Sequence, residues 1–311
     1  MRKFRGVLDG FRSAGGGSST KPEIEFRETI SASDFNFSKV VRYGFPNEPT
    51  CMAYDPVQKL LAIGNKSGAI RIFGRPGVDF YLQHDSPSAV KQLLFLINEG
   101  AFVSVCDDDC IHLWSFRQKK PEIVNSLQFQ KERITFCHIP LQSKWLYIGT
   151  DRGNIHVMCI EDFAVSGYVI NWNKAVGVSQ KTRPGRVTHL SNCPTDETKL
   201  LIGYESGAVT LWDLKNRSAD ARCYCSQSLT SISWHYEGKM FICAHTDGSL
   251  TTWSTKTQLS KPVQHLVPHA RKANTSTCSS TAAEDCGDTT TTKQQTSKLR
   301  AISNVEWRVG R

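Results

Sequence analysis

The side chains best suited to chemistry are those of cysteine and histidine, because thiolates and imidazoles bind metals and act as nucleophiles or bases. The 311-residue chain contains 11 cysteines and 9 histidines. Its closest cysteine pairs are Cys106 with Cys110 and Cys223 with Cys225, and neither pair belongs to a four-ligand set with zinc-type spacing. A strand histidine such as His112 is more often packed or solvated than a ligand. We therefore expect reduced thiols, with no metal site and no cofactor.

Other candidate groups for catalysis also lack a complete constellation. Ser206 lies in Gly-Tyr-Glu-Ser-Gly, which does not have the Gly-x-Ser-x-Gly spacing of a nucleophile elbow. The acidic run 107–109 is not followed by EF-hand spacing, so turn residues are favoured over a metal loop. The glycines at 15–17 are not followed by the Lys and Ser/Thr of a phosphate loop, which favours a flexible linker. The sequence predicts a protein that is not an enzyme.

The basic charge of the chain raises the question of a nucleic-acid partner. There are 38 Lys and Arg against 29 Asp and Glu, a net charge of +9. This excess is spread along the sequence, whereas a nucleic-acid binder is expected to concentrate it on one face. We therefore predict protein partners and no nucleic acid.

The N-terminal residues could contact a membrane surface. No apolar run reaches the ~18 residues of a membrane span, and the N-terminus lacks a signal-peptide core, so an intracellular protein is expected. Apolar residues with helical spacing alternate there with cations, in the set Arg2, Lys3, Phe4, Arg5, Val7, Leu8, Phe11 and Arg12. Four cations contribute about 4 kcal/mol at an anionic surface, which supports weak peripheral contact only. A loosely ordered tail is the alternative.

The Cys, His, Ser and Asp side chains named above lie within a sequence repeat, and the fold of this repeat must position them. Five copies share a small residue followed five positions later by a large one. The copies are Gly68 with Phe73, Asp109 with Trp114, Gly153 with Met158, Gly207 with Trp212, and Gly248 with Trp253. Successive copies are 41, 44, 54 and 41 residues apart, close to the ~40–45 residue period of WD repeats, with one insertion.

Each copy contains three apolar runs, which predicts three β-strands and a hairpin turn at the small residue. One small sheet cannot bury both faces alone, but sheets stacked about an axis can, with the large residue packed in the seam between neighbours. The prediction is an all-β WD-repeat β-propeller. A β-sandwich, the alternative, explains short strands but not their common phase.

The repeat also predicts the domain organisation. We expect an incomplete propeller with about five blades and the first strand of a sixth. The predicted segments are a flexible basic tail over 1–22, propeller blades over 23–269, a disordered Thr/Ser-rich linker over 270–298, and the truncated start of a further blade over 299–311. The segment 23–45 could add a strand to the last blade. A fragment or short product of a larger protein is the resulting hypothesis.

Several strings go beyond a generic repeat and resemble the lethal giant larvae family. They are VRYGFPNEP (41–49), AYDPVQKLLAIGNKSGAIRIFGRPGV (53–78), LINEGAFVSVCDDDCIHLW (96–114) and SKWLYIGTDRGNIHV (143–157). Three more resemble the syntaxin-binding tomosyn branch of that family: SGYVINWNKA (166–175), LLIGYESGAVTLWDLK (200–215) and WHYEGKMFICAHTDGSLTTWS (234–254). The resemblance covers about residues 1–270 and the last strand.

The resemblance implies a non-catalytic scaffold that regulates vesicle exocytosis and SNARE-dependent membrane fusion through syntaxin-linked contacts. It implies a cytoplasmic protein with peripheral association at the plasma membrane. Family members are also associated with non-muscle myosin II, cell polarity and GTPase regulation. A polarity-type scaffold that binds myosin II, or a generic WD-repeat adaptor, is therefore the alternative. The tomosyn branch binds syntaxin through a C-terminal SNARE-like helix, and this chain contains no such heptad segment.

Overall fold

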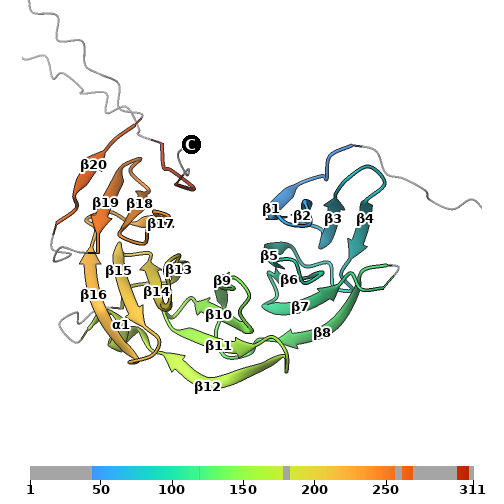
Figure 1. Ribbon diagram of the computed structural model, residues 1–311, viewed down its shortest axis with the longest axis horizontal. Coiled ribbons are helices and arrows are strands. Elements are labelled where there is room, and N and C mark those ends of the chain that lie inside the picture. Colours follow the sequence, from blue (N-terminus) through green and yellow to red (C-terminus); the bar gives the residue numbers. More distant parts are fainter. Residues whose placement is uncertain (1–43, 119, 178–182, 256–260, 269–299, 308–311) are drawn as a thin grey trace, which may run out of the picture. The chain divides into compact units, whose positions relative to one another are not determined.

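The computed structural model describes residues 44–118, 120–177, 183–255, 261–268 and 300–307, and all elements below lie in the unit Phe45–Arg311. The basic tail over 1–22 and the linker over 270–298 lie outside the described residues, as do residues 23–43 of the segment 23–45 that was predicted to add a strand. The described chain forms five four-stranded antiparallel sheets and one short helix. Each sheet keeps its strands in chain order (Figure 1).

Each sheet is built from consecutive strands. The bounds are, for sheet 1, β1 Pro49–Asp55, β2 Leu60–Asn65, β3 Ala69–Phe73 and β4 Asp79–Gln83; for sheet 2, β5 Val90–Leu96, β6 Ala101–Cys106, β7 Cys110–Ser115 and β8 Glu122–Gln128; for sheet 3, β9 Ile134–His138, β10 Trp145–Thr150, β11 Ile155–Cys159 and β12 Ala164–Ile170; for sheet 4, β13 Val187–Cys193, β14 Asp196–Tyr204, β15 Ala208–Asp213 and β16 Ser218–Tyr224; for sheet 5, β17 Leu229–Trp234, β18 Met240–His245, β19 Leu250–Ser254 and β20 Gln264–Leu266. The five phased repeats therefore correspond to five sheets, which confirms the predicted all-β fold.

The small residue of each copy lies in the turn between the second and third strands. Gly68, Gly153, Gly207 and Gly248 have φ between 81° and 90°, and Asp109 has φ 62° at the equivalent position. This left-handed region strains most residues with a Cβ, which explains the preference for glycine. The repeat frame thus reflects a backbone conformation shared by all five turns.

In four of the five copies the large residue packs between two neighbouring sheets. Trp114, Met158, Trp212 and Trp253 are buried, each in an apolar cluster that joins its own sheet to the preceding one. Four such clusters fill the four seams between successive sheets. Phe73 belongs to sheet 1, which has no preceding sheet among the described residues, and it is only partly buried. Burying large side chains between sheets stabilises the stack, because neither sheet could cover both of its faces alone.

The first strands β1, β5, β9, β13 and β17 contact one another in sequence, and threonine side chains link some of them. Thr50 Oγ1 lies 2.5 Å from the Val90 carbonyl oxygen, and Thr135 Oγ1 lies 2.7 Å from that of Val187. In each pair the hydroxyl donates to the first residue of the next sheet. These bonds hold adjacent first strands in register.

Residues 300–307 lie against β17 through similar bonds. Thr230 Oγ1 donates to the Ile302 carbonyl oxygen at 2.6 Å, and the Ser233 hydroxyl accepts from the Trp307 amide at 3.1 Å. Ile302 thus receives the bond that Val90 receives from Thr50. No strand ladder forms over 300–307, so the start of a further blade over 299–311 stays a prediction.

Two features differ from the three-strand prediction. Every sheet has a fourth strand, β4, β8, β12, β16 or β20, which the apolar pattern missed because at most one residue of each is buried. The 54-residue interval accommodates helix α1, Trp172–Val176, whose Ala175 carbonyl accepts hydrogen bonds from Thr210 and Arg222 of sheet 4. No helix in the described ranges is long and apolar enough to span a bilayer.

Candidate functional site

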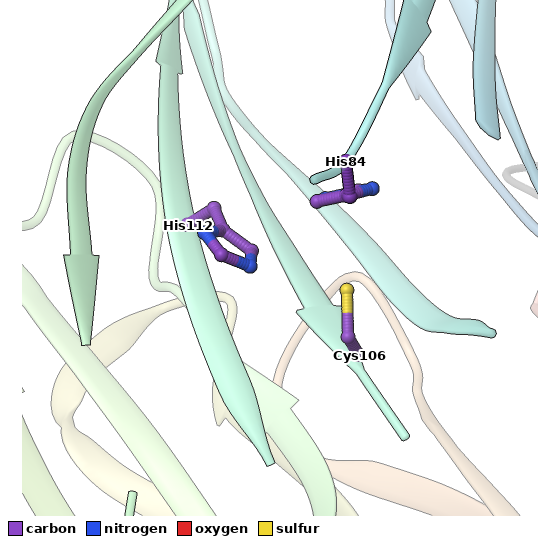
Figure 2. A group of neighbouring side chains, drawn as sticks. All are labelled: His84, Cys106 and His112. Atoms are coloured by element: carbon purple, nitrogen blue, oxygen red, sulfur yellow. The ribbon is translucent and has the colours of Figure 1, made fainter. Parts of the chain in front are cut away.

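Three potential metal ligands converge on the seam between sheets 1 and 2. His84 follows β4 of sheet 1, whereas Cys106 ends β6 and His112 lies in β7 of sheet 2. One ligand atom from each lies within 4.8 Å of the other two. Figure 2 shows that the sulfur of Cys106 points toward the two imidazole rings, which come from different elements. This is the only such group of His, Cys, Asp or Glu found in the described part of the chain.

The antiparallel register explains how two of these ligands meet. Ser104 of β6 pairs with His112 of β7, and Cys106 lies two residues beyond Ser104. Residues two apart in a strand face the same side, and directly paired residues share a face. Cys106 and His112 therefore face the seam with sheet 1, from which His84 enters.

The protonation state of His84 follows from its partners. Its Nδ1 lies 2.6 Å from the Gly68 carbonyl oxygen, which can only accept, so Nδ1 carries the proton. Its Nε2 therefore holds the lone pair and accepts from the Ser104 hydroxyl at 2.8 Å. Ser104 Oγ in turn accepts from Trp114 Nε1 at 2.9 Å. This buried chain of bonds orients the His84 lone pair toward sheet 2.

His112 and Cys106, the other two potential ligands, differ in their hydrogen bonds and burial. His112 Nδ1 lies 2.8 Å from Ser126 Oγ, and His112 is partly buried. Burial lowers the pKa of both His84 and His112, so both rings are neutral at pH 7. Burial also raises the pKa of the Cys106 thiol to about 12, and nearby Asp108 adds to this effect. Without a cation, the site therefore contains a thiol and two neutral imidazoles.

The seam between sheets 4 and 5 carries related side chains at equivalent positions. Cys225 follows β16 of sheet 4, and its amide donates to the Gly207 carbonyl, as the amide of His84 donates to the Gly68 carbonyl. The pairing of Cys243 with Thr251 is equivalent to that of Ser104 with His112, and His245 occupies the position of Cys106. Thr251 donates to or accepts from His245 Nε2 at 2.8 Å.

Cys225 and Cys243 form a hydrogen-bonded pair of thiols across the seam between sheets 4 and 5. A hydrogen bond from Cys243 lowers the pKa of Cys225, and His245 and Thr251 contribute further in the same direction. Burial and the same bond raise the pKa of Cys243. With threonine in place of a second histidine, this seam lacks the two imidazoles that meet a thiol between sheets 1 and 2.

A second candidate site is a cavity of about 560 Å³ where the first strands begin. Its lining includes Lys91, Thr135, Arg186, Glu205, Thr230 and Ser303. These residues come from sheets 2 to 5 and from the segment 300–307. We call this region the strand-start cavity. Ile134, Val187 and Leu229 also line it, so the cavity offers polar, charged and apolar groups to the side chains of a peptide.

Ion pairs surround the strand-start cavity. Lys91 Nζ lies 2.9 Å from Asp107 Oδ1, and Arg186 Nε lies 3.3 Å from Glu205 Oε1. The side chains of Arg186 and Glu205 are 58% and 48% exposed, and such exposed pairs contribute at most about 1 kcal/mol to stability. These charges can therefore rearrange toward a partner at low cost to the fold.

Residues dismissed as catalytic from the sequence occupy turns. Asp108 Oδ1 accepts the Cys110 amide, and Asp109 Oδ1 accepts the Ile134 amide of the next sheet. Ser206 lies in the turn before Gly207, and its hydroxyl accepts the Ala208 amide at 3.5 Å. The eight candidate membrane-contact residues between Arg2 and Arg12 lie outside the described residues.

Sequence reasoning missed the convergence of His84, Cys106 and His112. His84 precedes Cys106 by 22 positions and lies in a different sheet, so linear spacing contains no metal motif. Aligning the five copies would have placed Cys106 and His112 on one face of a hairpin. The approach of His84 required the packing of the two sheets.

The fold defines the class of protein. Five sequential four-stranded sheets joined through apolar seams are blades of a WD-repeat β-propeller. A chain in the crystal structure of the mitotic checkpoint complex has a similar fold, with a TM-score of 0.59 and 14% identity, covering 71% of this chain and 65% of that one. At this identity the likeness concerns the fold alone. No family model matches the sequence.

Sequence similarity to curated proteins defines the family, which the likeness in fold does not. The chain is 32% identical over 271 residues to the mouse protein named LLGL scribble cell polarity complex component 2, which covers 78% of this chain. It is 30% identical over 253 residues to the lethal(2) giant larvae protein of Drosophila melanogaster, covering 76% of this chain. The chain is therefore homologous to the lethal giant larvae proteins. It spans 26% and 22% of the length of these two relatives.

Proposed function

We propose that this chain is part of a non-catalytic protein scaffold of the cell-polarity type. The observation that carries this proposal is homology to lethal giant larvae proteins, one of which is named as a component of the scribble cell polarity complex. The relatives therefore favour the polarity alternative over the syntaxin-linked exocytosis role that the tomosyn-like strings predict.

The strand-start cavity is our proposed surface for a protein partner. It is lined by Lys91, Arg186 and Glu205, and Asp107 forms an ion pair with Lys91, so the region offers both charges to a partner. Complementary charges steer association and set specificity. A polypeptide with acidic and polar side chains could bind here by exchanging these intramolecular ion pairs for intermolecular ones.

The test is affinity capture from polarised epithelial cells with the tagged full chain. We expect capture of polarity-complex proteins, with about a tenfold loss in the double variant Lys91→Glu, Arg186→Glu, because a charge reversal removes steering and complementarity. The control is Lys174→Glu, a charge reversal at an exposed position in α1. Circular dichroism and a thermal melt of each variant establish that the sheets are intact.

Different results separate the candidate functions. Capture of polarity proteins without syntaxins supports the proposed function. Capture of syntaxins or other SNARE proteins alone supports exocytosis regulation instead, and capture of non-muscle myosin II alone supports a myosin-linked scaffold. Equal capture by the wild-type chain and the double variant would exclude the strand-start cavity as the binding surface.

Peripheral contact with the plasma membrane is the second part of the proposal. It rests on the alternation of apolar and basic residues between Arg2 and Arg12. Co-sedimentation with vesicles of 30% phosphatidylserine, compared with neutral vesicles, measures it. Removal of residues 1–12 should abolish binding to the anionic vesicles, and unchanged binding contradicts the proposal. A cytoplasmic location with this peripheral contact follows.

A further inference from the structure

We propose that His84, Cys106 and His112 form a binding site for one thiophilic monovalent cation, with Cu(I) as the cation that fits best. Their ligand atoms already lie within 4.8 Å of one another. Atoms that share an ion at bond lengths of about 2.0–2.3 Å lie roughly 3.3–3.8 Å apart. Side-chain rotations that close about 1 Å would therefore complete the site, without movement of a sheet.

The bonds around the histidines resemble those that orient metal ligands. A ligating imidazole commonly donates its other N–H to a carbonyl, carboxylate or hydroxyl, which leaves the free nitrogen aimed at the metal. His84 does this through Nδ1 and the Gly68 carbonyl. His112 places Nδ1 against Ser126 Oγ, and Figure 2 shows its other ring nitrogen on the side of Cys106.

When no cation is bound, the Ser104 hydroxyl donates a hydrogen bond to the lone pair of His84 Nε2. Its hydroxyl hydrogen points at His84 Nε2, and its oxygen accepts from Trp114 Nε1. A cation would take the place of that hydrogen on Nε2, while Ser104 keeps its bond with Trp114 by rotating its O–H. The indole bond that supports the seam therefore survives occupation of the site.

Charge and burial select the cation. Cys106 is 1% exposed and His84 is 3% exposed, so an unbalanced charge at this site would be costly. One thiolate and two neutral imidazoles carry a charge of −1, which Cu(I) neutralises and Zn²⁺ exceeds. Thiolate is also a soft ligand that suits Cu(I). Binding replaces the thiol proton with the cation, and the proton leaves to solvent, so the step is balanced without an oxidant.

The repeat supplies an internal comparison. The seam between sheets 4 and 5 has Cys225, Cys243 and His245 in the same region but carries Thr251 where sheet 2 has His112. Threonine is a poor ligand for a soft cation. That seam therefore has two thiols and one imidazole, and it serves as the control for binding by two cysteines with a single histidine.

The experiment titrates Cu(I) into the full chain under anaerobic, reducing conditions, against a chromophoric chelator. We expect one equivalent bound per chain, and roughly a 100-fold or greater loss of affinity in Cys106→Ser and in His112→Gln. Cys110→Ser and Cys225→Ser are the matched controls and should retain the wild-type affinity. X-ray absorption of the loaded protein should show one sulfur and two nitrogen ligands.

Three results would overturn the assignment. Equal affinity in all four variants would show that Cu(I) binds elsewhere. Loss in Cys225→Ser but not in Cys106→Ser would move the site to the seam between sheets 4 and 5. Tighter binding of Zn²⁺ than of Cu(I) at the same residues would contradict the charge argument. Unfolding of each variant without metal, followed by circular dichroism, separates ligand loss from misfolding.

Discussion

At the scale of single residues, the turn between the second and third strands shows why one position recurs. Four sheets place glycine there and sheet 2 places Asp109, yet all five residues have positive φ. The shared requirement is therefore a backbone conformation and not a functional side chain. Glycine meets it at the lowest steric cost.

Gly207→Ala should be strongly destabilising. Gly207 has φ 90°, and an added Cβ would lie 2.4 Å from the Gln227 carbonyl oxygen and 2.7 Å from that of Cys225. We expect the free energy of unfolding to fall by about 2–4 kcal/mol, from left-handed strain and collision with the backbone. Urea denaturation measures it. Gly100→Ala is the control, because Gly100 has φ 68° but open space around its Cβ, and it should cost only about 1 kcal/mol. Equal losses would argue against the collision.

Two histidines of the first strands should make stability depend on pH. Burial lowers the pKa of His138 and of His189 to about 4 each. In the unfolded chain they take up protons near pH 6.5, so between pH 6.5 and 4 the unfolded state binds more protons. The free energy of unfolding should therefore fall as the pH drops through this window, by about 3 kcal/mol per histidine at most.

Urea unfolding at pH 7.5, 6, 5 and 4.5 measures this dependence. The double variant His138→Gln, His189→Gln should have a flatter profile over this range. His265→Gln, at an exposed position in β20, is the control and should follow the wild-type profile. An unchanged slope in the double variant would contradict the assignment to these two groups.

At the scale of elements, the threonine bonds between first strands contribute to the stacking of sheets. Thr135 Oγ1 reaches both the Gly149 carbonyl oxygen of its own sheet and that of Val187 in the next. Thr188 Oγ1 lies 3.3 Å from the Gly203 carbonyl oxygen within its own sheet. Of these two threonines, Thr135 spans a seam and Thr188 does not.

Thr135→Val should therefore cost more than Thr188→Val. Valine keeps the shape and strand propensity of threonine but leaves the partner carbonyls without the hydroxyl. We expect a loss of about 1–2 kcal/mol for Thr135→Val and about 0.5 kcal/mol for Thr188→Val. Differential scanning calorimetry compares the two. If both variants have the same melting temperature, the hydrogen bond across the seam contributes no more to stability than the one within a sheet.

The elements themselves were partly predictable. The three strands that contain apolar runs were found from their phase, because buried strands such as β2 and β15 read as continuous hydrophobic segments. The fourth strands were missed, since a strand such as β8 exposes every second residue and resembles a polar loop. Pairing with the buried third strand holds this edge strand in place, and no local pattern records that pairing.

At the scale of the whole molecule, the seams make neighbouring sheets depend on each other. Trp212 packs among residues of sheets 3 and 4, whereas Trp253 packs among residues of sheets 4 and 5. Each sheet contacts only its sequential neighbours through these clusters. Such an arrangement predicts that a local defect spreads to one adjacent sheet and no further.

Hydrogen exchange followed by mass spectrometry tests this dependence. Trp212→Ala should reduce amide protection in sheets 3 and 4, and Trp253→Ala should reduce it in sheets 4 and 5. Each change leaves a large cavity and should cost about 3–5 kcal/mol. Sheet 1 should keep its protection in both variants. Uniform loss across all five sheets would instead indicate a single cooperative unit.

The sequence alone determined the number and phase of the sheets, the tight turns and the large residues that face the seams. These features depend on local backbone conformation and on periodic burial, both of which leave a pattern in every copy. The tertiary structure decided which polar side chains meet. His84 reaches Cys106 and His112 because one sheet's loop packs on the next sheet's face, and the strand register puts both partners on that face. Such contacts between sheets have no fixed spacing along the chain, so they emerge only when the sheets are packed.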